Sequence, residues 1–252
     1  MAGRTAAARR LLELAVVALA MSHMSVARAG SGMDGTATAS PSALHIRDVA
    51  TEAPAPRADF GGETASPDVR DLADWVRASR DSQALPFVII DKINARVFVF
   101  DRRGDIRGAT AALLGLGRGD DSVVGIGHRK LSTIAPAERT TPAGRFQASL
   151  GHDFVQDILW IDYDSALSLH RVIVGNSKER RAERLASATV QDNRISFGCI
   201  NVPAAFYDAV IVPAFTGTVG IVYILPETRS LRAVFPIPES RPLSTSSGAD
   251  TR

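Results

Sequence analysis

The residue best suited to covalent chemistry is Cys199, the only cysteine in the 252-residue sequence. It cannot form an internal disulfide, which leaves packing, metal binding, redox pairing with another chain or nucleophilic attack. Gly198 precedes it and lets a substrate or another backbone approach closely. Apolar Ile195, Ile200 and Val202 indicate that a loop runs into a buried strand here. A buried cysteine that acts only as a small hydrophobic residue is the simplest alternative.

The residues around this cysteine form a short motif. Ser196, Gly198, Cys199, Ile200 and Asn201 give the order Ser-x-Gly-Cys-Ile-Asn. This order resembles the active-site signature of the L,D-transpeptidases (the YkuD-type catalytic domain). In that family, Ser/Thr-His-Gly-Cys is followed by an apolar residue and then by Asn or Arg.

Two upstream segments resemble the same family, in the family's order. His170 follows an apolar and acidic run at 158–169 and stands where the family has its second signature residue. Residues 141–146 read Thr-Pro-Ala-Gly-Arg-Phe, which is similar to the family's Thr-Pro-x-Gly-x-Phe element. Together the three matches span roughly residues 86–226.

The sequence departs from the family pattern at three places. Phe197 stands where the family usually has a histidine, and Arg171 stands where a glycine or serine often follows the upstream histidine. His170 and Cys199 are 29 positions apart, which is longer than in the family and predicts an insert between them.

The resemblance implies a cysteine acyl transferase that acts on peptidoglycan stem peptides. Cys199 would be the nucleophile and His170 its base, since a free thiol with a pKa of about 8.5 is mostly protonated at neutral pH. Gly198 and Ser196 are expected to position the oxyanion, together with the Cys199 backbone N–H. A covalent thioester would then pass to a second stem amine or to water. No metal and no organic cofactor is expected.

The substrate carries carboxylates, so arginines near the motif are candidate binding residues. The insert is basic between residues 178 and 184, with one lysine and three arginines against two glutamates. We therefore expect either a solvated helix face or a lid over the cleft. The substrate-binding residues that the sequence predicts are Arg194, Asn201, Arg171, Arg180 and Arg184.

Three other functions remain open. A catalytically inactive wall-binding module would keep the cleft and leave the thiol unused, and Phe197 and Arg171 are compatible with it. An L,D-carboxypeptidase would use water as the acceptor. A thiol redox sensor would need a resolving cysteine from another chain. A dinucleotide site at Gly115, Gly117 and Gly119 is rejected, because no Gly-Lys-Ser/Thr and no helix pattern follow.

The elements that must position these residues are mostly strands. Apolar and β-branched runs at 87–90, 96–100, 158–163 and 219–225 predict strands, and the last reads as a buried central strand. Ser66, Pro67 and Asp68 predict the start of a helix over 66–82. The sequence favours a mainly β single domain at 85–228 with a short N-terminal helix and a helical insert. The resemblance implies the L,D-transpeptidase β-sandwich.

The two ends of the chain read differently. Residues 1–29 predict a secretory signal peptide, and without them the formal net charge changes from +2 to −1, which disfavours nucleic-acid binding. Residues 30–65 predict a flexible tether, and residues 229–252 a loosely ordered tail. We expect an exported protein of the periplasm or cell envelope whose partner is peptidoglycan and which contacts a membrane only through its signal. The oligomeric state stays open.

Overall fold

The computed structural model describes residues 57–153 and 155–238. The chain divides into two units, 1–51 and 52–252, and all described residues belong to the second. The predicted signal peptide and the predicted tether up to residue 56 lie outside the described residues. In the ranges that the structure describes, every helix is too short or too polar to cross a membrane.

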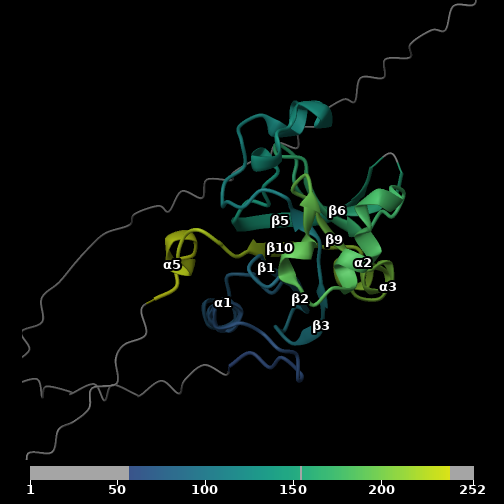
Figure 1. Cartoon of the computed structure of the whole chain (residues 1–252). Coiled ribbons are helices and arrows are strands. Elements are labelled where there is room, and N and C mark those ends of the chain that lie inside the picture. Colours follow the sequence, from purple (N-terminus) through teal and green to yellow (C-terminus); the bar gives the residue numbers. More distant parts are fainter. Residues whose placement is uncertain (1–56, 154, 239–252) are drawn as a thin grey trace, which may run out of the picture. The chain divides into compact units, whose positions relative to one another are not determined.

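The described residues are mainly β, as the sequence predicts (Figure 1). The helices are α1 (Pro67–Ser79), α2 (Arg181–Ala186), α3 (Ala204–Phe206), α4 (Val212–Phe215) and α5 (Leu231–Val234). A π-helical turn at Tyr207–Ile211 joins α3 to α4. The strands are β1 (Phe87–Asp91), β2 (Arg96–Phe100), β3 (Ile106–Ala111), β4 (Leu114–Gly115), β5 (Gly144–His152), β6 (Asp157–Asp162), β7 (Leu167–Arg171), β8 (Arg194–Ser196), β9 (Ile200–Val202) and β10 (Val219–Ile224).

Eight strands form one mixed sheet in the order β3-β2-β1-β10-β5-β6-β7-β9. β1 pairs with β10 and β7 pairs with β9 in parallel, and the other neighbours are antiparallel. The small strands β4 and β8 pair in a second, two-stranded sheet. The buried strand predicted at 219–225 is β10, in the middle of the large sheet.

The large sheet curls until its two ends meet. Leu113 follows the edge strand β3 and exchanges two backbone hydrogen bonds with Asn201 of the opposite edge strand β9, at 2.8 and 2.9 Å. The strands expected to form a sandwich therefore form a nearly closed sheet. This closure matters for function because β9 immediately follows the single cysteine.

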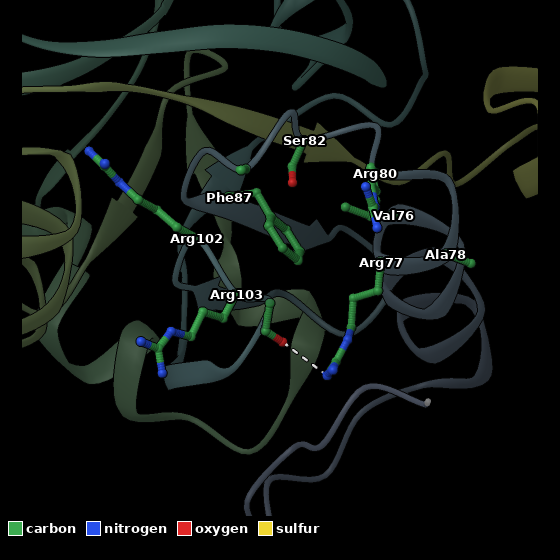
Figure 2. Close-up of a pocket in the computed structure, with 10 residues that line it drawn as sticks. Val76, Arg77, Ala78, Arg80, Ser82, Phe87, Arg102 and Arg103 are labelled. Carbon is green, nitrogen blue, oxygen red and sulfur yellow. Dashed lines mark hydrogen bonds between the residues drawn. The ribbon is translucent and has the colours of Figure 1, made fainter. Parts of the chain in front are cut away.

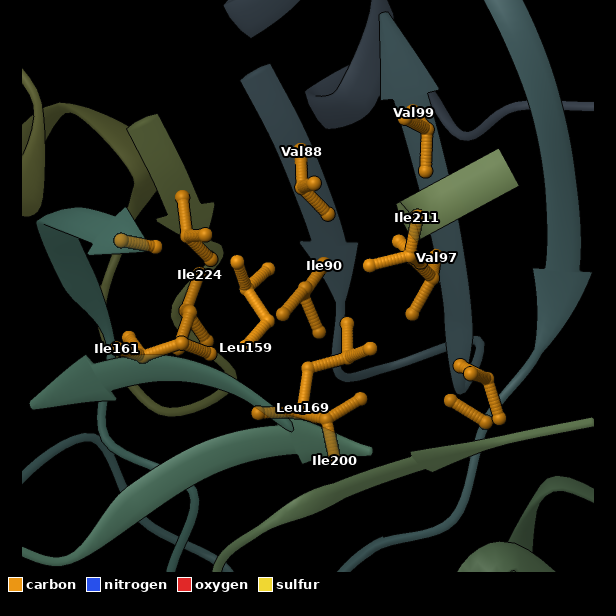
Figure 3. Packing of buried hydrophobic residues seen from close by; sticks show 14 of the residues in the cluster. Val88, Ile90, Val97, Val99, Leu159, Ile161, Leu169, Ile200, Ile211 and Ile224 are labelled. Carbon is orange, nitrogen blue, oxygen red and sulfur yellow. The ribbon is translucent and has the colours of Figure 1, made fainter. Parts of the chain in front are cut away.

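The main core fills the inside of the curled sheet (Figure 3). Side chains alternate along each strand, so every second residue faces inward. The inward set includes Val88, Ile90, Leu159, Leu169 and Ile200, all of them fully buried. The residues between them face outward, which leaves the outer side of β7 for polar groups.

Helix α1 covers part of the outer face. Ser66 caps its first turn by accepting a hydrogen bond from Val69 N–H, and Pro67 follows as the first helical residue, as the sequence predicts. The buried stripe Val69, Leu72 and Val76 packs on aromatic side chains of β1, β2 and β10 and forms the second core cluster.

The ordered body extends past the predicted domain at both ends. Within the predicted tether, Phe60 is 4% exposed, and its ring packs edge-on against Phe98 and Phe100. Within the predicted tail, α5 buries Leu231, and Phe235 packs beside Tyr223. Residues 239–252 lie outside the described residues. In both segments, single buried apolar side chains pack on the domain. They do not recur at a helix or strand period, so the sequence pattern did not predict their burial.

Candidate active site

The edge pair β7 and β9 brings the histidine and the cysteine together across the insert. The strands run in parallel, with Leu169 beside Ile200 and His170 beside Asn201. One step earlier in this register, Ser168 lies beside Cys199. Because Leu167 and Leu169 point into the core, Ser168 and His170 point outward, toward the thiol.

Two side chains of β7 surround the sulfur. The Ser168 hydroxyl donates to Cys199 Sγ at 3.6 Å, and Sγ lies 3.5 Å from the Ala166 carbonyl oxygen. His170 Nδ1 lies 2.8 Å from the Arg171 carbonyl oxygen, the geometry of a donated N–H. This bond fixes the ring and leaves Nε2 as the nitrogen that can accept a proton from the thiol.

The electrostatics polarise this pair. Burial raises the pKa of the Cys199 thiol, but a hydrogen bond from His170, the charge of that ring and the Ser168 hydroxyl together bring it below its ordinary value. Burial lowers the pKa of His170, and the hydrogen bond and charge of Cys199 raise it above its usual value, with smaller contributions from the Arg171 carbonyl and Asp153. Both shifts favour a thiolate beside an imidazolium, which is the reactive form of a cysteine nucleophile.

The turn that carries the cysteine requires a glycine. Gly198 has a φ of 136°, and a Cβ there would lie 2.7 Å from the Thr140 carbonyl oxygen. Thr141, the first residue of the Thr-Pro element, holds this turn from the other side. Its hydroxyl donates to the Gly198 carbonyl at 2.7 Å and accepts from Gly115 N–H at 2.9 Å. Fully buried, Thr141 ties two distant segments to the nucleophile.

The backbone around the cysteine is held by three further bonds. The Ser196 hydroxyl donates to the Cys199 carbonyl at 2.6 Å and accepts from Gly198 N–H at 3.1 Å. Asn201 Nδ2 donates to the same carbonyl at 3.2 Å. The Gly198 N–H, expected as an oxyanion donor, is therefore already used. The Cys199 N–H has no hydrogen-bond acceptor within 57–153 and 155–238, so it remains as a donor.

A cavity of about 90 Å³ opens beside the thiol. The segment between β4 and β5 forms one wall, which includes Ile126, Arg129 and Ile134, and the β6–β7 turn forms the other. Arg129 is held there by Glu138 at 2.8 Å. Half-buried Cys199 thus faces a small, mainly apolar space.

Phe197 occupies the position of the family's histidine. Its ring lies under the Arg139 guanidinium, 4.0 Å from ring centroid to the guanidinium carbon, and it lines the same cavity. Arg139 in turn donates twice to the Ile134 carbonyl, at 3.1 and 3.2 Å. Here the aromatic side chain helps to hold the cavity wall.

Two predicted substrate-binding residues next to the motif are buried. Arg194 pairs with Glu227 at 2.6 Å and donates to the Lys92 carbonyl at 2.8 Å, so it lies in an internal network. Asn201 is 1% exposed and bonds the Cys199 carbonyl and Arg181. Neither side chain lines the cavity beside the thiol.

Arg171 points away from the thiol. It pairs with Asp157 at 2.8 Å, contacts Asp208 as well, and lies over the Tyr207 ring at 4.3 Å. Since it follows His170 on β7, the alternation of the strand places it on the opposite face. These contacts give Arg171 a structural role at the position where the family often has glycine or serine.

The helical part of the insert contains α2 and contacts β9, and no residue from 171 to 196 lines the cavity at Cys199. Arg181 reaches Asn201 at 2.9 Å, and Arg184 donates to the backbone of Glu179 and Asp192. Arg180 is exposed beside Glu183. The long segment between β4 and β5, rather than the insert, covers the thiol.

Sequence reasoning missed Ser168, and it identified Thr141 only as part of a family element, without a role for its hydroxyl. Ser168 could have been predicted, because residues two apart on a strand share a face and it lies two positions before His170. The bonds of Thr141 could not, because they join residues 26 and 57 positions away in the sequence. Throughout the described ranges, no three His, Cys, Asp or Glu side chains cluster as metal ligands would.

Comparison with known proteins gives structural likeness only. No protein-family model matches the sequence. No curated protein matches it either.

Among solved structures, the helical cell-shape-determining protein Pgp2 from Campylobacter jejuni is similar over 57% of this chain, with 13% identity and a TM-score of 0.38. This chain spans only 49% of the Pgp2 structure. The catalytic domain of an L,D-transpeptidase from E. faecium is similar over 55% of this chain and 95% of its own length, with 18% identity and a TM-score of 0.33. An L,D-transpeptidase from Xylanimonas cellulosilytica matches 56% of this chain and 60% of its own length, with 16% identity and a TM-score of 0.30.

These structures include L,D-transpeptidases, the family that the sequence motifs resemble. At TM-scores below 0.5 the likeness adds nothing to the case for a particular chemistry. That case depends on the geometry around Cys199.

Proposed function

We propose that this protein is a cysteine acyl transferase acting on peptidoglycan stem peptides, an L,D-transpeptidase. The observation that carries the proposal is the position of Cys199, which lines a cavity and lies beside the strand that carries Ser168 and His170. A cysteine that only filled the core would need neither a histidine on the neighbouring strand nor an opening. The motif order in the sequence supplies the substrate class.

The reaction follows from the groups present. The Cys199 thiolate attacks the carbonyl carbon of a stem amide, and the Cys199 N–H stabilises the oxyanion that forms. His170 gives its proton to the departing amine as the C–N bond breaks, which leaves a thioester on Sγ. A second amine, or water, then attacks the thioester and loses a proton to His170, and the thiolate is restored. Ser168 and Thr141 hold the sulfur and the turn in place.

The bond cleaved would lie between the diamino acid at position three of a stem tetrapeptide and its terminal D-Ala. Alanine is small, as is the cavity of about 90 Å³ beside the thiol, which suits this leaving group. A wall substrate requires export, and the predicted signal at residues 1–29 provides for it. The protein would therefore act in the periplasm or cell envelope.

The test is incubation of the purified protein with a disaccharide-tetrapeptide, followed by mass spectrometry. Loss of D-Ala with a crosslinked product supports transpeptidation, and loss of D-Ala alone supports a carboxypeptidase. Cys199→Ala and His170→Ala should each abolish turnover, and the double variant should lose no more than either, since the two residues act as one unit. Binding without turnover would indicate a catalytically inactive wall-binding module. If the protein neither binds nor converts the substrate, the proposal is rejected.

A further inference from the structure

A second cavity lies beside α1 (Figure 2). It has a volume of about 440 Å³ and lies between the C-terminal end of α1 and the turn that joins β2 to β3. None of its lining residues lines the cavity beside Cys199. The residues that line it are Val76, Arg77, Ala78, Arg80, Ser82, Ala84, Phe87, Arg102, Arg103 and Gly104.

The charge of this cavity is one-sided. Four of its lining residues are arginines, Arg77 and Arg80 on one wall and Arg102 and Arg103 on the other, and no acidic residue lines it. None of the four forms an ion pair with any residue in the described part of the chain. The whole chain has a formal net charge of only +2, so a local charge of +4 is a concentration of charge and does not reflect a generally basic protein.

Two carboxylates next to lining residues in the sequence, Asp81 and Asp101, already have partners. Asp101 accepts hydrogen bonds from the backbone N–H groups of Arg103 and Asp105 and approaches Arg107 at 3.9 Å. Asp81 pairs with Arg145 and accepts a bond from the Tyr223 hydroxyl. Like charges around one cavity repel each other, and a bound anion would reduce that repulsion.

The cavity also has fixed walls. Arg77 Nη1 donates to the Gly104 carbonyl at 3.4 Å, as Figure 2 shows. Gly104 has a φ of 82°, and a Cβ there would lie 2.9 Å from Arg77 Cγ, so the glycine allows the arginine stem to lie on the turn. Buried Phe87, stacked on Phe100 at 4.6 Å, supports the cavity from below.

A neighbouring cavity extends the same basic surface. It has a volume of about 360 Å³, and it shares Arg102 and Arg103 with the first cavity and adds Arg107 together with one acidic residue, Asp101. Two arginines therefore stand between two hollows that could each hold an anionic group.

We propose that the arginine-lined cavity between α1 and the β2–β3 turn binds phosphate groups. The planar guanidinium fork matches the oxygens of a phosphate, and several forks around one cavity suit a ligand with more than one negative charge. The phosphates would belong either to a soluble phosphate compound or to the headgroups of an anionic membrane. The proposal does not depend on the activity proposed for Cys199.

The experiment uses the full chain and two probes. Inorganic pyrophosphate is titrated by calorimetry, and vesicles of phosphatidylcholine with and without about 30% phosphatidylglycerol are tested by co-sedimentation. We expect binding to at least one probe, weakened by added salt. Binding to pyrophosphate alone assigns a soluble ligand, and binding to anionic vesicles alone assigns a membrane surface.

Two double variants and a matched control locate the site. Arg102→Gln with Arg103→Gln, and Arg77→Gln with Arg80→Gln, should each weaken binding about tenfold or more, because they remove charge from opposite walls. Arg118→Gln with Lys178→Gln removes the same charge from exposed positions outside the cavity and should change binding less than about twofold. No binding to either probe, or an equal loss in the control, would overturn the proposal.

Discussion

At the scale of single residues, the local structure around Cys199 leaves two groups free to react. Ser196, Asn201 and Thr141 occupy the carbonyls of Cys199 and Gly198. The Cys199 N–H and the sulfur remain, and His170 lies beside the sulfur. This arrangement separates the groups that hold the turn from the groups that would perform the chemistry.

A pH profile of thiol alkylation tests the pair. The pKa of Cys199 lies below its ordinary value chiefly because the hydrogen bond and charge of His170 overcome the effect of burial. Alkylation by iodoacetamide, which requires the thiolate, should therefore reach its half-maximal rate at a lower pH than in a free cysteine peptide. The rate is followed by mass spectrometry from about pH 5 to pH 10.

His170→Ala serves as the comparison. It removes the imidazole that contributes most to lowering the thiol pKa, and it leaves Ser168 and the burial that raises this pKa, so the midpoint should move to higher pH. His152→Ala removes a histidine from β5 that makes no contact with the sulfur, and it should leave the midpoint in place. An unchanged midpoint in His170→Ala would mean that the two side chains do not interact.

At the scale of elements, the segment between β4 and β5 both covers the thiol and supports its turn. Arg129, Ile126 and Ile134 lie at the cavity, and Thr141 joins this segment to Gly198 and Gly115. The predicted lid, the insert between His170 and Cys199, instead contacts β9 through Arg181. The insert, which was expected to be a solvated helix face or a lid, therefore contacts the strand that follows Cys199 and does not cover the thiol.

Thr141→Val should damage both stability and activity. Valine keeps the shape of the side chain but leaves the buried Gly198 carbonyl and Gly115 N–H unpaired, which should lower the free energy of unfolding by about 1–3 kcal/mol. Because the nucleophile turn loses its support, kcat for the disaccharide-tetrapeptide should fall more than tenfold. Denaturant unfolding and steady-state kinetics measure the two effects.

Thr140→Val provides the matched control. The Thr140 hydroxyl donates to the Asp121 carbonyl at 2.7 Å near the surface, away from the Gly198 carbonyl. Its loss should lower the free energy of unfolding by less than about 1 kcal/mol, since water can replace the bond. If the two variants behave alike, the Thr141 hydroxyl does not support the turn.

At the scale of the whole described domain, a buried ionic network joins distant parts of the chain. Lys92 donates to Asp120 at 2.7 Å and to the Thr141 carbonyl at 2.9 Å, and Arg194 pairs with Glu227 at 2.6 Å. Asp120 also accepts the backbone N–H groups at the start of the C-terminal segment. The network thereby connects the turn after β1, the cover of the thiol and the residues that follow β10.

This network predicts the acid sensitivity of the fold. Burial raises the pKa of Asp120, but hydrogen bonds from Lys92, Thr228 and the backbone hold it well below the usual range in the folded state. A carboxylate with a lowered folded pKa stabilises the protein above its unfolded pKa of about 4, and that contribution is lost as the pH falls toward the folded pKa. The free energy of unfolding should therefore fall steeply below about pH 4.

Asp120→Asn tests this prediction, and Asp121→Asn serves as its control. The Asp120 variant leaves buried Lys92 with only the more distant carboxylate of Glu227, at 3.8 Å, so it should lose about 3–5 kcal/mol at neutral pH and show a shallower decline in acid. Asp121 is exposed, with a single ion pair to Arg229, and its variant should follow the wild type. Urea unfolding at a series of pH values measures both. A parallel decline in all three proteins would place the acid sensitivity elsewhere.

The sequence by itself determined the mainly β fold class, because the strand pattern is local. The runs at 87–90 and 96–100 became β1 and β2, and Ser66 with Pro67 began α1 where the cap pattern placed it. The motif around Cys199 could also be recognised from the sequence, since its residues are adjacent in the chain. Each of these signals lies within a few residues, where backbone preference and side-chain period act directly.

Only the tertiary structure decided what the charged side chains do. Arg194 looked like a substrate-binding residue from its place beside the motif, yet its partner Glu227 lies 33 positions away and holds it inside. Nothing in the sequence indicated that Arg77 and Arg102 line the same cavity, because this depends on the packing of α1 beside the β2–β3 turn. A long charged side chain can reach many partners, so its role depends on which segments the fold brings within hydrogen-bond distance, and the chain order does not contain that information.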